Sequence, residues 1–512
     1  MHGAESAITT AEREQDNVLR ARRLGIETQH EAIVFARKDC PVCRAEGFAS
    51  HTRIRLARGR RSIIATLYQI TSDLLRPGEI GLSESAWHRL GPAEGERIAV
   101  SHPPVVESFG AVRGKVYGHR LQAQTAAKIV NDVLAGRYSD IQLSAFLTAC
   151  AARPLDFEET VALTAAMANA GSRIAWPVSK VMDKHCVGGL PGNRTTPIVV
   201  AIAASCGLTI PKTSSRAITS PAGTADTMET MAPVDLDLAA MRRVVEREGG
   251  CVVWGEMVRL SPVDDLLIRV ERALDFDNGG QLVASVLSKK IAAGATHLLV
   301  DMPVGETAKV RSQQDAMSLR KRLVEVAAAF GIEANVVITD GSQPIGRRIG
   351  PALEALDVLA VLRGDDRAPA DLREHALGLA GALLELGGAT VGSGYHEALA
   401  ALASGRAWDK FQKICEAQGG MREPPVARQS RPIEAKSEGR VSRIDNRRLA
   451  KLAKLAGAPD AKAAGIELNV RIDDYVDANE PLFTIHAETR GELAYAMDYL
   501  AAAGNIVTLS DA

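Results

Sequence analysis

The sequence predicts a multidomain α/β protein with four parts in series. Three observations support this: short strand-like runs before about Val100, an apolar pattern of helical period after Pro103-Pro104, and alternating strand-like and helical runs from Pro177 onward. A chain of 512 residues is long enough for about three or four domains. The expected parts are a small β-rich N-terminal module (residues 1–100), a helical domain (101–176), a large α/β domain with a mainly parallel sheet (177–423) and a small C-terminal α+β domain (433–512).

Composition limits the class of protein. The 61 Lys and Arg residues are balanced by 62 Asp and Glu residues, so no overall charge attracts this chain to nucleic acid or to a membrane surface. No apolar run reaches the roughly 18 residues of a membrane span, and the N-terminus lacks the apolar core of a signal peptide. Seven scattered cysteines do not form a disulfide framework. We therefore expect a globular cytoplasmic protein without nucleic-acid or membrane partners.

The N-terminal module contains strand-like runs and one pair of closely spaced cysteines. The runs are Ala32–Ala36, Thr52–Leu56 and Arg61–Thr71, and the pair Pro77–Ser83 and Glu96–Val100 is similar to a fragment of a cradle-type barrel. We expect this module to serve assembly rather than chemistry. Cys40 and Cys43 have a zinc-like spacing, but His51 as a third ligand leaves such a site one short. Two reduced cysteines and no metal are expected, with a zinc site completed by another subunit as the open alternative.

The later parts show helical and then mixed periodicity. Ile129, Val130, Val133 and Leu134 fall on one helix face, and Asp140 is placed to cap a second helix that carries Leu143, Phe146 and Leu147. Ligands of parallel sheets bind at the carboxyl ends of the strands. The predicted strands are Val178–Met182, Leu208–Pro211, His297–Met302 and Asn335–Ile338, with a helix at Ala316–Phe330, a linker at Met421–Pro432, β segments at Gly465–Val476 and Pro481–His486, and a final helix from Gly491.

A glycine-rich run, Asp183–Arg194, precedes the uncharged segment Thr195–Cys206. It predicts a strand, a turn and a buried helix. Glycines allow backbone amides to approach an oxyanion, and a helix N-terminus adds partial positive charge. Lys184, His185 and Arg194 supply formal or potential charge beside the turn. We therefore expect an anion site here.

A second loop, Thr213–Glu229, is dense in hydroxyl groups around one arginine. Hydroxyls and a guanidinium can satisfy several phosphate oxygens without a metal ion. The nucleotide fingerprints do not account for these loops: Gly188–Arg194 lacks the Lys-Ser/Thr of a P-loop, and Glu397 occupies the third glycine position after Gly392-Ser393-Gly394. Two such loops at neighbouring strand ends could enclose one dianion.

These two segments together resemble the signatures of the thymidine phosphorylase family. The matching residues are Lys184–Gly189, Ser214-Ser215-Arg216 and Gly223–Glu229, and the resemblance covers about Ser101 to Ala512. The N-terminal module and the wording of Ser215–Ser220 are similar to the long branch of that family, which contains AMP phosphorylases and bacterial proteins described as thymidine phosphorylases.

The resemblance implies phosphorolysis: orthophosphate attacks the anomeric carbon of a nucleoside, the base leaves, and a sugar 1-phosphate remains. By motif position, catalysis would use Asp277 as proton donor and His185. Phosphate would be bound by Lys184, Cys186, Thr196, Ser214 and Thr224. Substrate would be bound by Gly189, Ser215, Arg216, Ala217, Ile218, Thr219, Ser220, Ser285, Lys289 and Lys309. Cys186 departs from the family's short branch, which has serine there, and a thiol is the weaker donor. No cofactor is implied, because orthophosphate is a co-substrate.

The residue types alone also allow ordinary structural roles. Thr219 and Ser220 could be turn residues that bond their own backbone, Asp277 before Asn278-Gly279-Gly280 could be a turn aspartate, and Lys289-Lys290 could be a solvated helix face.

The substrate remains open between two classes. If Arg216, Thr219 and Ser220 face the 5′ position of the sugar, they could bind a second phosphate, and the substrate would be a nucleoside 5′-monophosphate that yields ribose 1,5-bisphosphate. If they face elsewhere, the substrate is a free nucleoside such as thymidine, which yields 2-deoxyribose 1-phosphate. Two alternatives lie outside this reaction: an enzyme like anthranilate phosphoribosyltransferase, which would require magnesium, and a non-catalytic nucleotide-binding protein. A homodimer or larger homo-oligomer is implied by the resemblance.

Overall fold

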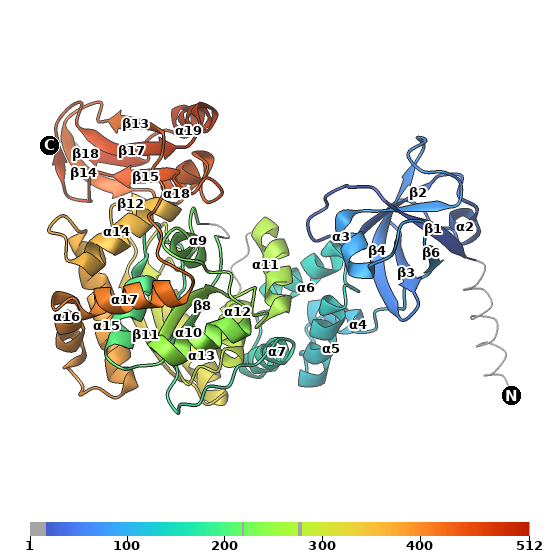
Figure 1. Ribbon diagram of the computed structural model, residues 1–512, viewed down its shortest axis with the longest axis horizontal. Helices are drawn as coiled ribbons and strands as arrows, with labels where there is room; N and C mark the ends of the chain where they lie inside the picture. The colour runs from blue at the N-terminus through green and yellow to red at the C-terminus, as the bar shows by residue number, and fades with distance from the viewer. Residues whose placement is uncertain (1–16, 218–219, 275–278, 511–512) are drawn as a thin grey trace. The chain divides into compact units, whose positions relative to one another are not determined.

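The computed structural model describes residues 17–217, 220–274 and 279–510 (Figure 1). It divides into two compact units, one formed by the residues up to His119 with Lys128–Ala149, and the other by Arg120–Ala127 with Cys150–Ala512. The predicted multidomain α/β class is confirmed. The N-terminal module, the α/β domain and the C-terminal module each have a separate hydrophobic core.

The N-terminal module is a closed barrel of strands in the order β1-β5-β2-β4-β3-β6. Buried side chains alternate along β2 and β3, where Val34, Ile54 and Leu56 are fully buried, and Leu67 of β4 is fully buried as well. The barrel buries Cys40 and Cys43 beside the first turn of a short helix. Its elements are β1 (Val18–Arg23), β2 (Ile33–Arg37), α2 (Pro41–Ala45), β3 (Arg53–Arg58), β4 (Arg61–Ile70), β5 (Glu79–Leu82), α3 (Glu84–Leu90) and β6 (Arg97–Ser101).

Four helices follow the barrel: α4 (Phe109–Val116), α5 (Ala123–Leu134), α6 (Asp140–Ala152) and α7 (Phe157–Asn169). The predicted apolar face of α5 is buried at Ile129, Val130 and Val133. The predicted cap of α6 was displaced by one residue. Asp140 is already in the first turn, whereas Ser139 Oγ accepts from the Gln142 amide at 3.3 Å and the Gln142 side chain accepts from the Ser139 amide at 2.9 Å. A reciprocal capping box therefore fixes this helix start.

The α/β domain contains two groups of parallel strands. One sheet has the order β11-β10-β7, and β8 pairs with β9. The amide of Met182 donates to the Thr209 carbonyl at 2.8 Å, which joins the start of β7 to the chain entering β8. The strands are β7 (Met182–Cys186), β8 (Ile210–Ser214), β9 (Gly250–Trp254), β10 (His297–Val304) and β11 (Glu333–Asp340).

Two predicted strand positions were wrong by several residues. The strand expected at Val178–Met182 begins only at Met182, and the one expected at Leu208–Pro211 begins at Ile210. The reason is pairing: Met182 to Cys186 are in register with His297 to Asp301 of β10, so the polar residues of the motif belong to the strand itself. Apolar content alone had placed the strand too early.

Helices surround these strands (Figure 1). Helix α8, the predicted buried helix, has ten consecutive buried residues from Thr195 to Ala204, because it packs against both β8–β9 and α15, α16 and α17. The helices are α8 (Thr195–Ser205), α9 (Thr224–Glu229), α10 (Leu238–Glu248), α11 (Pro262–Leu274), α12 (Gly279–Ala292), α13 (Gln313–Ala329), α14 (Pro351–Arg363), α15 (Ala370–Gly387), α16 (Gly394–Ala403) and α17 (Arg406–Ala417).

The C-terminal module combines two antiparallel sheets with two helices. One sheet has the order β12-β15-β17-β13, so the short strand β12 of the preceding domain joins it. The other has the order β16-β14-β18. The elements are β12 (Arg348–Ile349), β13 (Gln429–Glu434), β14 (Gly439–Ile444), α18 (Asn446–Leu455), β15 (Gly465–Leu468), β16 (Tyr475–Val476), β17 (Pro481–Ala487), α19 (Arg490–Ala503) and β18 (Val507–Ser510). None of the described helices is long and apolar enough to span a bilayer.

Candidate functional site

Lys184 lies in β7 and is fully buried. Its Nζ donates to Thr195 Oγ1 at 2.8 Å and lies 3.5 Å from Thr196 Oγ1, both in the first turn of α8. Its ion-pair partner is Asp301 of β10, with Oδ2 at 3.7 Å. The strand, the turn and the helix N-terminus predicted from the sequence are thus joined by one ammonium group.

Asp301 collects donors from several elements. Asn193 Nδ2 donates to Oδ2 at 2.9 Å, Thr339 Oγ1 donates to Oδ1 at 2.9 Å, and His375 Nε2 lies 3.2 Å from Oδ2. Burial by itself would raise the pKa of this carboxyl, but the hydrogen bond from His375 and the charge of Lys184 outweigh it and lower the pKa well below its usual value. Asp301 is therefore an ionised anchor, and no sequence motif marked it.

His185 faces a different set of charges. Side chains alternate along a strand, so His185 shares a face of β7 with Asp183 rather than with Lys184. Asp183 is buried between two lysines, with Lys290 Nζ at 2.8 Å and Lys212 Nζ at 3.3 Å from its oxygens. Burial, and then the charges of Lys290 and Lys212, lower the pKa of His185 well below its usual value. The imidazole is therefore neutral at neutral pH.

The turn after β7 is closed by contacts from a distant loop. Cys186 Sγ accepts from Asn193 Nδ2 at 3.5 Å, and burial, aided by the charge of Asp301, raises the pKa of this thiol to about 12. Gly189 has φ +87°, and a β-carbon on it would lie 2.4 Å from the backbone nitrogen of Lys309. Only glycine fits there. The Lys309 backbone, in the loop after β10, consequently packs directly on the glycine turn, and its side chain is exposed.

The second candidate loop begins at Ser214, the last residue of β8. The Ser214 hydroxyl is buried and has no hydrogen-bond partner within the part of the chain that the structure describes. Thr224 is the first residue of α9, and its Oγ1 accepts from Arg194 Nη1 at 2.9 Å. Arg194 also donates to the Ala222 carbonyl at 2.8 Å. The two predicted loops therefore converge in space, linked by an arginine that precedes α8.

Arg194 is itself balanced by a buried carboxylate. Its Nε donates to Glu354 Oε2 of α14 at 2.5 Å, and Thr227 Oγ1 donates to the same oxygen at 3.2 Å. The side chain of Glu354 is 1% exposed. The sequence suggested charge for Arg194 beside the turn but contained no signal for this partner, which lies 160 residues away along the chain.

Arg216 is engaged by acidic side chains, although its own side chain is 28% exposed. Its guanidinium forms a two-pronged pair with Glu229, at 2.7 and 2.8 Å, and lies 4.5 Å above the ring of Trp254. It also lies 3.3 Å from carboxylate oxygens of Asp226 and Asp235. The hydrogen bonds from Arg216 lower the pKa of Glu229 to about 2. This pairing locks the arginine in place.

The rest of the same loop has mixed exposure. The Ala217 amide donates to Asp226 Oδ2 at 2.6 Å, and Ser220 Oγ donates to the Ala222 carbonyl at 2.8 Å. Ser215 is exposed. Ile218 and Thr219, which the sequence also placed in the site, lie outside the described residues.

Two of the predicted substrate-binding residues, Ser285 and Lys289, lie on α12. Lys289 Nζ donates to Asp264 Oδ2 of α11 at 2.5 Å, and Ser285 lies one helical turn earlier with a partly exposed side chain. Burial lowers the pKa of Lys289, but the charge of Asp264 more than offsets this and raises it overall. Asp264 is therefore a further site neighbour that the sequence reasoning missed. Asp277, the predicted proton donor, lies outside the described residues.

The C-terminal module reaches the same region through Lys462, whose Nζ lies 2.9 Å from Glu229 Oε2 and 3.5 Å from Asp226 Oδ1, and through a buried amide. Asn446, at the start of α18, donates from Nδ2 to Thr307 Oγ1 at 2.9 Å and to the Gly341 carbonyl at 3.1 Å. These acceptors lie in the loops after β10 and β11, and the first of these loops carries Lys309. Asn446 was not predicted, since a single asparagine in a sequence carries no signal of such a contact.

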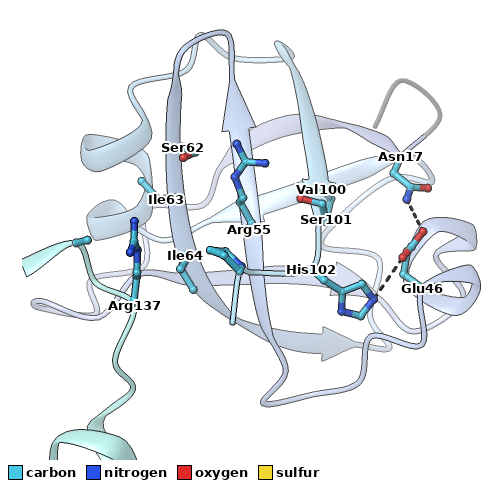
Figure 2. A pocket seen from close by; sticks show the side chains of 12 residues that line it. Asn17, Glu46, Arg55, Ser62, Ile63, Ile64, Val100, Ser101, His102 and Arg137 are labelled. Carbon is cyan, nitrogen blue, oxygen red and sulfur yellow. Dashed lines mark hydrogen bonds and ion pairs between the residues drawn. The ribbon is translucent and has the colours of Figure 1, made fainter. Parts of the chain in front are cut away.

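A separate cavity of about 620 Å³ opens in the N-terminal unit (Figure 2). Glu46 lies between Asn17 and His102, with contacts at 2.6 and 3.3 Å, while Arg55 and Arg137 also line the space. None of the predicted site residues lines it. Within the described ranges, no group of three or more His, Cys, Asp or Glu residues is arranged to hold a metal ion.

Comparisons with known proteins agree with this architecture. Three family models match: the helical bundle domain of a glycosyl transferase family at residues 111–171, the a/b domain of the same family at 178–408, and the pyrimidine nucleoside phosphorylase C-terminal domain at 440–507. The crystal structure of anthranilate phosphoribosyltransferase from Thermus thermophilus is similar in fold, with a TM-score of 0.50 and 21% sequence identity, covering 60% of this chain and 99% of that one.

Curated relatives match nearly the whole chain. "Putative thymidine phosphorylase 1" of Acidovorax sp. (strain JS42) is 62% identical over 95% of this chain and 95% of its own length. "Putative thymidine phosphorylase" of Chelativorans sp. (strain BNC1) is 59% identical over 96% and 97%, respectively. The chain therefore belongs to the thymidine phosphorylase family, and it is a glycosyltransferase of the nucleoside phosphorylase type.

Proposed function

We propose that this enzyme cleaves free pyrimidine nucleosides of the thymidine type with orthophosphate. A phosphate oxygen would form a bond to C1′ while the bond from C1′ to the base nitrogen breaks, and its electron pair would leave with the base. The products would be thymine and 2-deoxyribose 1-phosphate. The observation that carries this proposal is the convergence of the two loops through Arg194 and Thr224, at the N-termini of α8 and α9.

The phosphate would lie between the start of α8 and the loop that leads into α9. The donors would be the Lys184 ammonium, the Cys186 thiol and the hydroxyls of Thr196, Ser214 and Thr224. Backbone amides at a helix N-terminus favour an anion, and the unpartnered Ser214 hydroxyl gives the site a donor that requires an acceptor. Holding the nucleophile in one geometry lowers the entropic part of the barrier.

The departing base needs a hydrogen-bond donor on the side of the sugar opposite to the phosphate. Because its pKa is lowered, neutral His185 would offer one ring N–H to a base carbonyl without carrying a full charge. Lys289, Ser285 and Lys309 would contact the base and sugar, and Asp277 would deliver the proton that the leaving nitrogen takes. Such an acid acts near neutral pH only if its surroundings raise its pKa.

The environment of Arg216 supports a free nucleoside. Its guanidinium is already satisfied by Glu229, Asp226 and Asp235, so a second phosphate would have to compete with three carboxylates. The Ser220 hydroxyl has an intramolecular acceptor as well. Curated relatives named as thymidine phosphorylases are in line with this choice.

A nucleoside 5′-monophosphate is the second candidate, because of Lys309. Its ammonium forms no ion pair within the described ranges, and its backbone packs on Gly189 of the glycine turn. A cation beside the candidate site could bind a second phosphate, in which case the product would be ribose 1,5-bisphosphate.

A substrate panel tests the proposal. Purified enzyme is incubated with thymidine, uridine, AMP, CMP and UMP, with and without orthophosphate, and released base is measured. We expect phosphate-dependent release from thymidine that continues in the presence of a magnesium chelator, whereas a reaction like that of anthranilate phosphoribosyltransferase would require magnesium. Release from the monophosphates alone would replace the first candidate by the second, and no release from any substrate would refute phosphorolysis.

A further inference from the structure

Arg194 makes three charge-assisted contacts, two with the segment Ala222–Thr224 and one with Glu354 of α14. Nε donates to Glu354 Oε2 at 2.5 Å, Nη1 to Thr224 Oγ1 at 2.9 Å, and Nη2 to the Ala222 carbonyl at 2.8 Å. The arginine side chain is 11% exposed and that of Glu354 is 1% exposed. Since each guanidinium nitrogen has a partner, the orientation of the group is fixed by geometry.

The contact with Thr224 has a chemical consequence. A guanidinium only donates hydrogen bonds, so the Thr224 hydroxyl must be the acceptor in this pair. The single proton of that hydroxyl is then left to donate in another direction. Thr224 is the first residue of α9, and the proposed function places orthophosphate beside it and beside Ser214, whose buried hydroxyl has no partner among the described residues, so an orthophosphate oxygen is the expected acceptor.

Because Glu354 neutralises Arg194, we assign Arg194 a positioning role and not the role of a further positive charge that attracts phosphate. Glu354 accepts from Arg194, from Thr227 Oγ1 at 3.2 Å and from the Gly350 amide at 3.2 Å, so the carboxylate is held by the helix that follows β12. The ion pair cancels most of the charge of Arg194. We therefore expect Arg194 to act on phosphate through Thr224.

We propose that Arg194, held by Glu354, is a positioning residue that joins the two phosphate loops and turns the Thr224 hydroxyl into a donor toward orthophosphate. This inference rests on the proposed phosphorolysis for its kinetic test. It also predicts orthophosphate binding, which can be measured without turnover.

The principal test is Arg194→Lys, because one ammonium nitrogen cannot take the three separate positions from which Nε, Nη1 and Nη2 contact Glu354, Thr224 and Ala222. The KM for orthophosphate should rise at least roughly tenfold, while the KM for the nucleoside changes less than about threefold. The matched control is Lys410→Met, which removes the cation from buried Glu248 between α10 and α17 and contacts neither loop. It should leave both KM values unchanged. Equal rises of the two KM values in Arg194→Lys would overturn the proposal.

A double-mutant cycle distinguishes action of Arg194 through Thr224 from a general contribution of Arg194 to the structure of the site. Thr224→Ala and Arg194→Lys should each weaken orthophosphate binding, and the combined variant should be hardly weaker than Thr224→Ala alone. Additive losses would contradict action through Thr224. If Arg194→Lys does not fold, the paired change Arg194→Gln with Glu354→Gln removes both charges together and takes the place of Arg194→Lys in the same cycle with Thr224→Ala.

Orthophosphate binding by calorimetry distinguishes the two hypotheses. If the wild type binds orthophosphate but releases no base, the proposed function fails while the cycle still tests Arg194. Unchanged orthophosphate affinity in Arg194→Lys would refute the positioning role whatever the activity.

Discussion

Lys184 and Asp301 form a fully buried ion pair between the neighbouring parallel strands β7 and β10, with Nζ 3.7 Å from Oδ2. The carboxylate is fixed in turn by Asn193 and Thr339. Lys184 also donates to Thr195 at the start of α8, so its ammonium has a defined place at the candidate phosphate site. Charge that is fixed before the reaction needs no rearrangement during it.

Removing Lys184 should impair base release without abolishing the fold. We expect Lys184→Met to lower phosphate-dependent base release at least roughly tenfold, because the buried ammonium group at the candidate phosphate site is lost. The fold should persist because Asp301 keeps its hydrogen bonds to Asn193, Thr339 and His375. Initial rates at varied orthophosphate, with circular dichroism of the variant, provide the measurement. Lys180→Met, which removes an exposed lysine that donates to the Gly387 carbonyl, is the control. Wild-type rates in the Lys184 variant would contradict its assigned role.

His185 should make stability depend on pH in one direction. Its folded-state pKa is lowered from the unperturbed 6.5, so below about that pH the unfolded chain binds more protons than the folded one. The free energy of unfolding should therefore fall as pH drops from 6.5 toward the folded-state pKa, and this contribution should be constant above 6.5. Urea unfolding between about pH 5 and about pH 8 measures it. His185→Asn should show a shallower decline, and an identical decline would mean that this histidine is not the cause.

Cys186 should behave as a weak neutral donor. Because burial raises its pKa to about 12, the thiol remains protonated at neutral pH. We expect Cys186→Ser to keep or lower the KM for orthophosphate, since a hydroxyl is a better donor, and Cys186→Ala to raise it by roughly threefold to tenfold. Cys206→Ser, at the opposite end of α8, is the control and should change nothing. A Cys186→Ala enzyme with an unaltered KM would exclude the thiol from phosphate binding.

The paired glycines of the turn should differ sharply. Gly188 and Gly189 have φ of +91° and +87°, but a β-carbon meets nothing within 4 Å at Gly188 and the Lys309 backbone at 2.4 Å at Gly189. Gly188→Ala should cost about 1 kcal/mol through backbone strain alone. Gly189→Ala should cost clearly more and also reduce activity, because the Lys309 loop must move away. Denaturant unfolding and base-release rates measure both, and equal effects of the two substitutions would show that the contact with Lys309 is unimportant.

Much of the fold could be predicted from local pattern. The apolar face of α5 follows from helical periodicity, and the buried helix α8 and the strands β10 and β11 follow from continuous apolar runs. In each case the signal lies in residues that are close together in the sequence. The starts of β7 and β8 were placed too early, because polar residues such as Lys184 are tolerated in a strand only when a distant partner such as Asp301 neutralises them.

The same distinction between local sequence pattern and long-range contact applies to the candidate site. By itself, the sequence determined the family, the glycine turn and the hydroxyl-rich loop, since these depend on residue types at fixed short spacings. Only the tertiary structure decided that Arg194 joins Glu354 to Thr224, that Arg216 is held by Glu229, and that Asn446 braces the Lys309 loop. Buried charged and polar groups must find partners, and those of Arg194 and Asn446 lie on segments brought close only by packing of the whole domain.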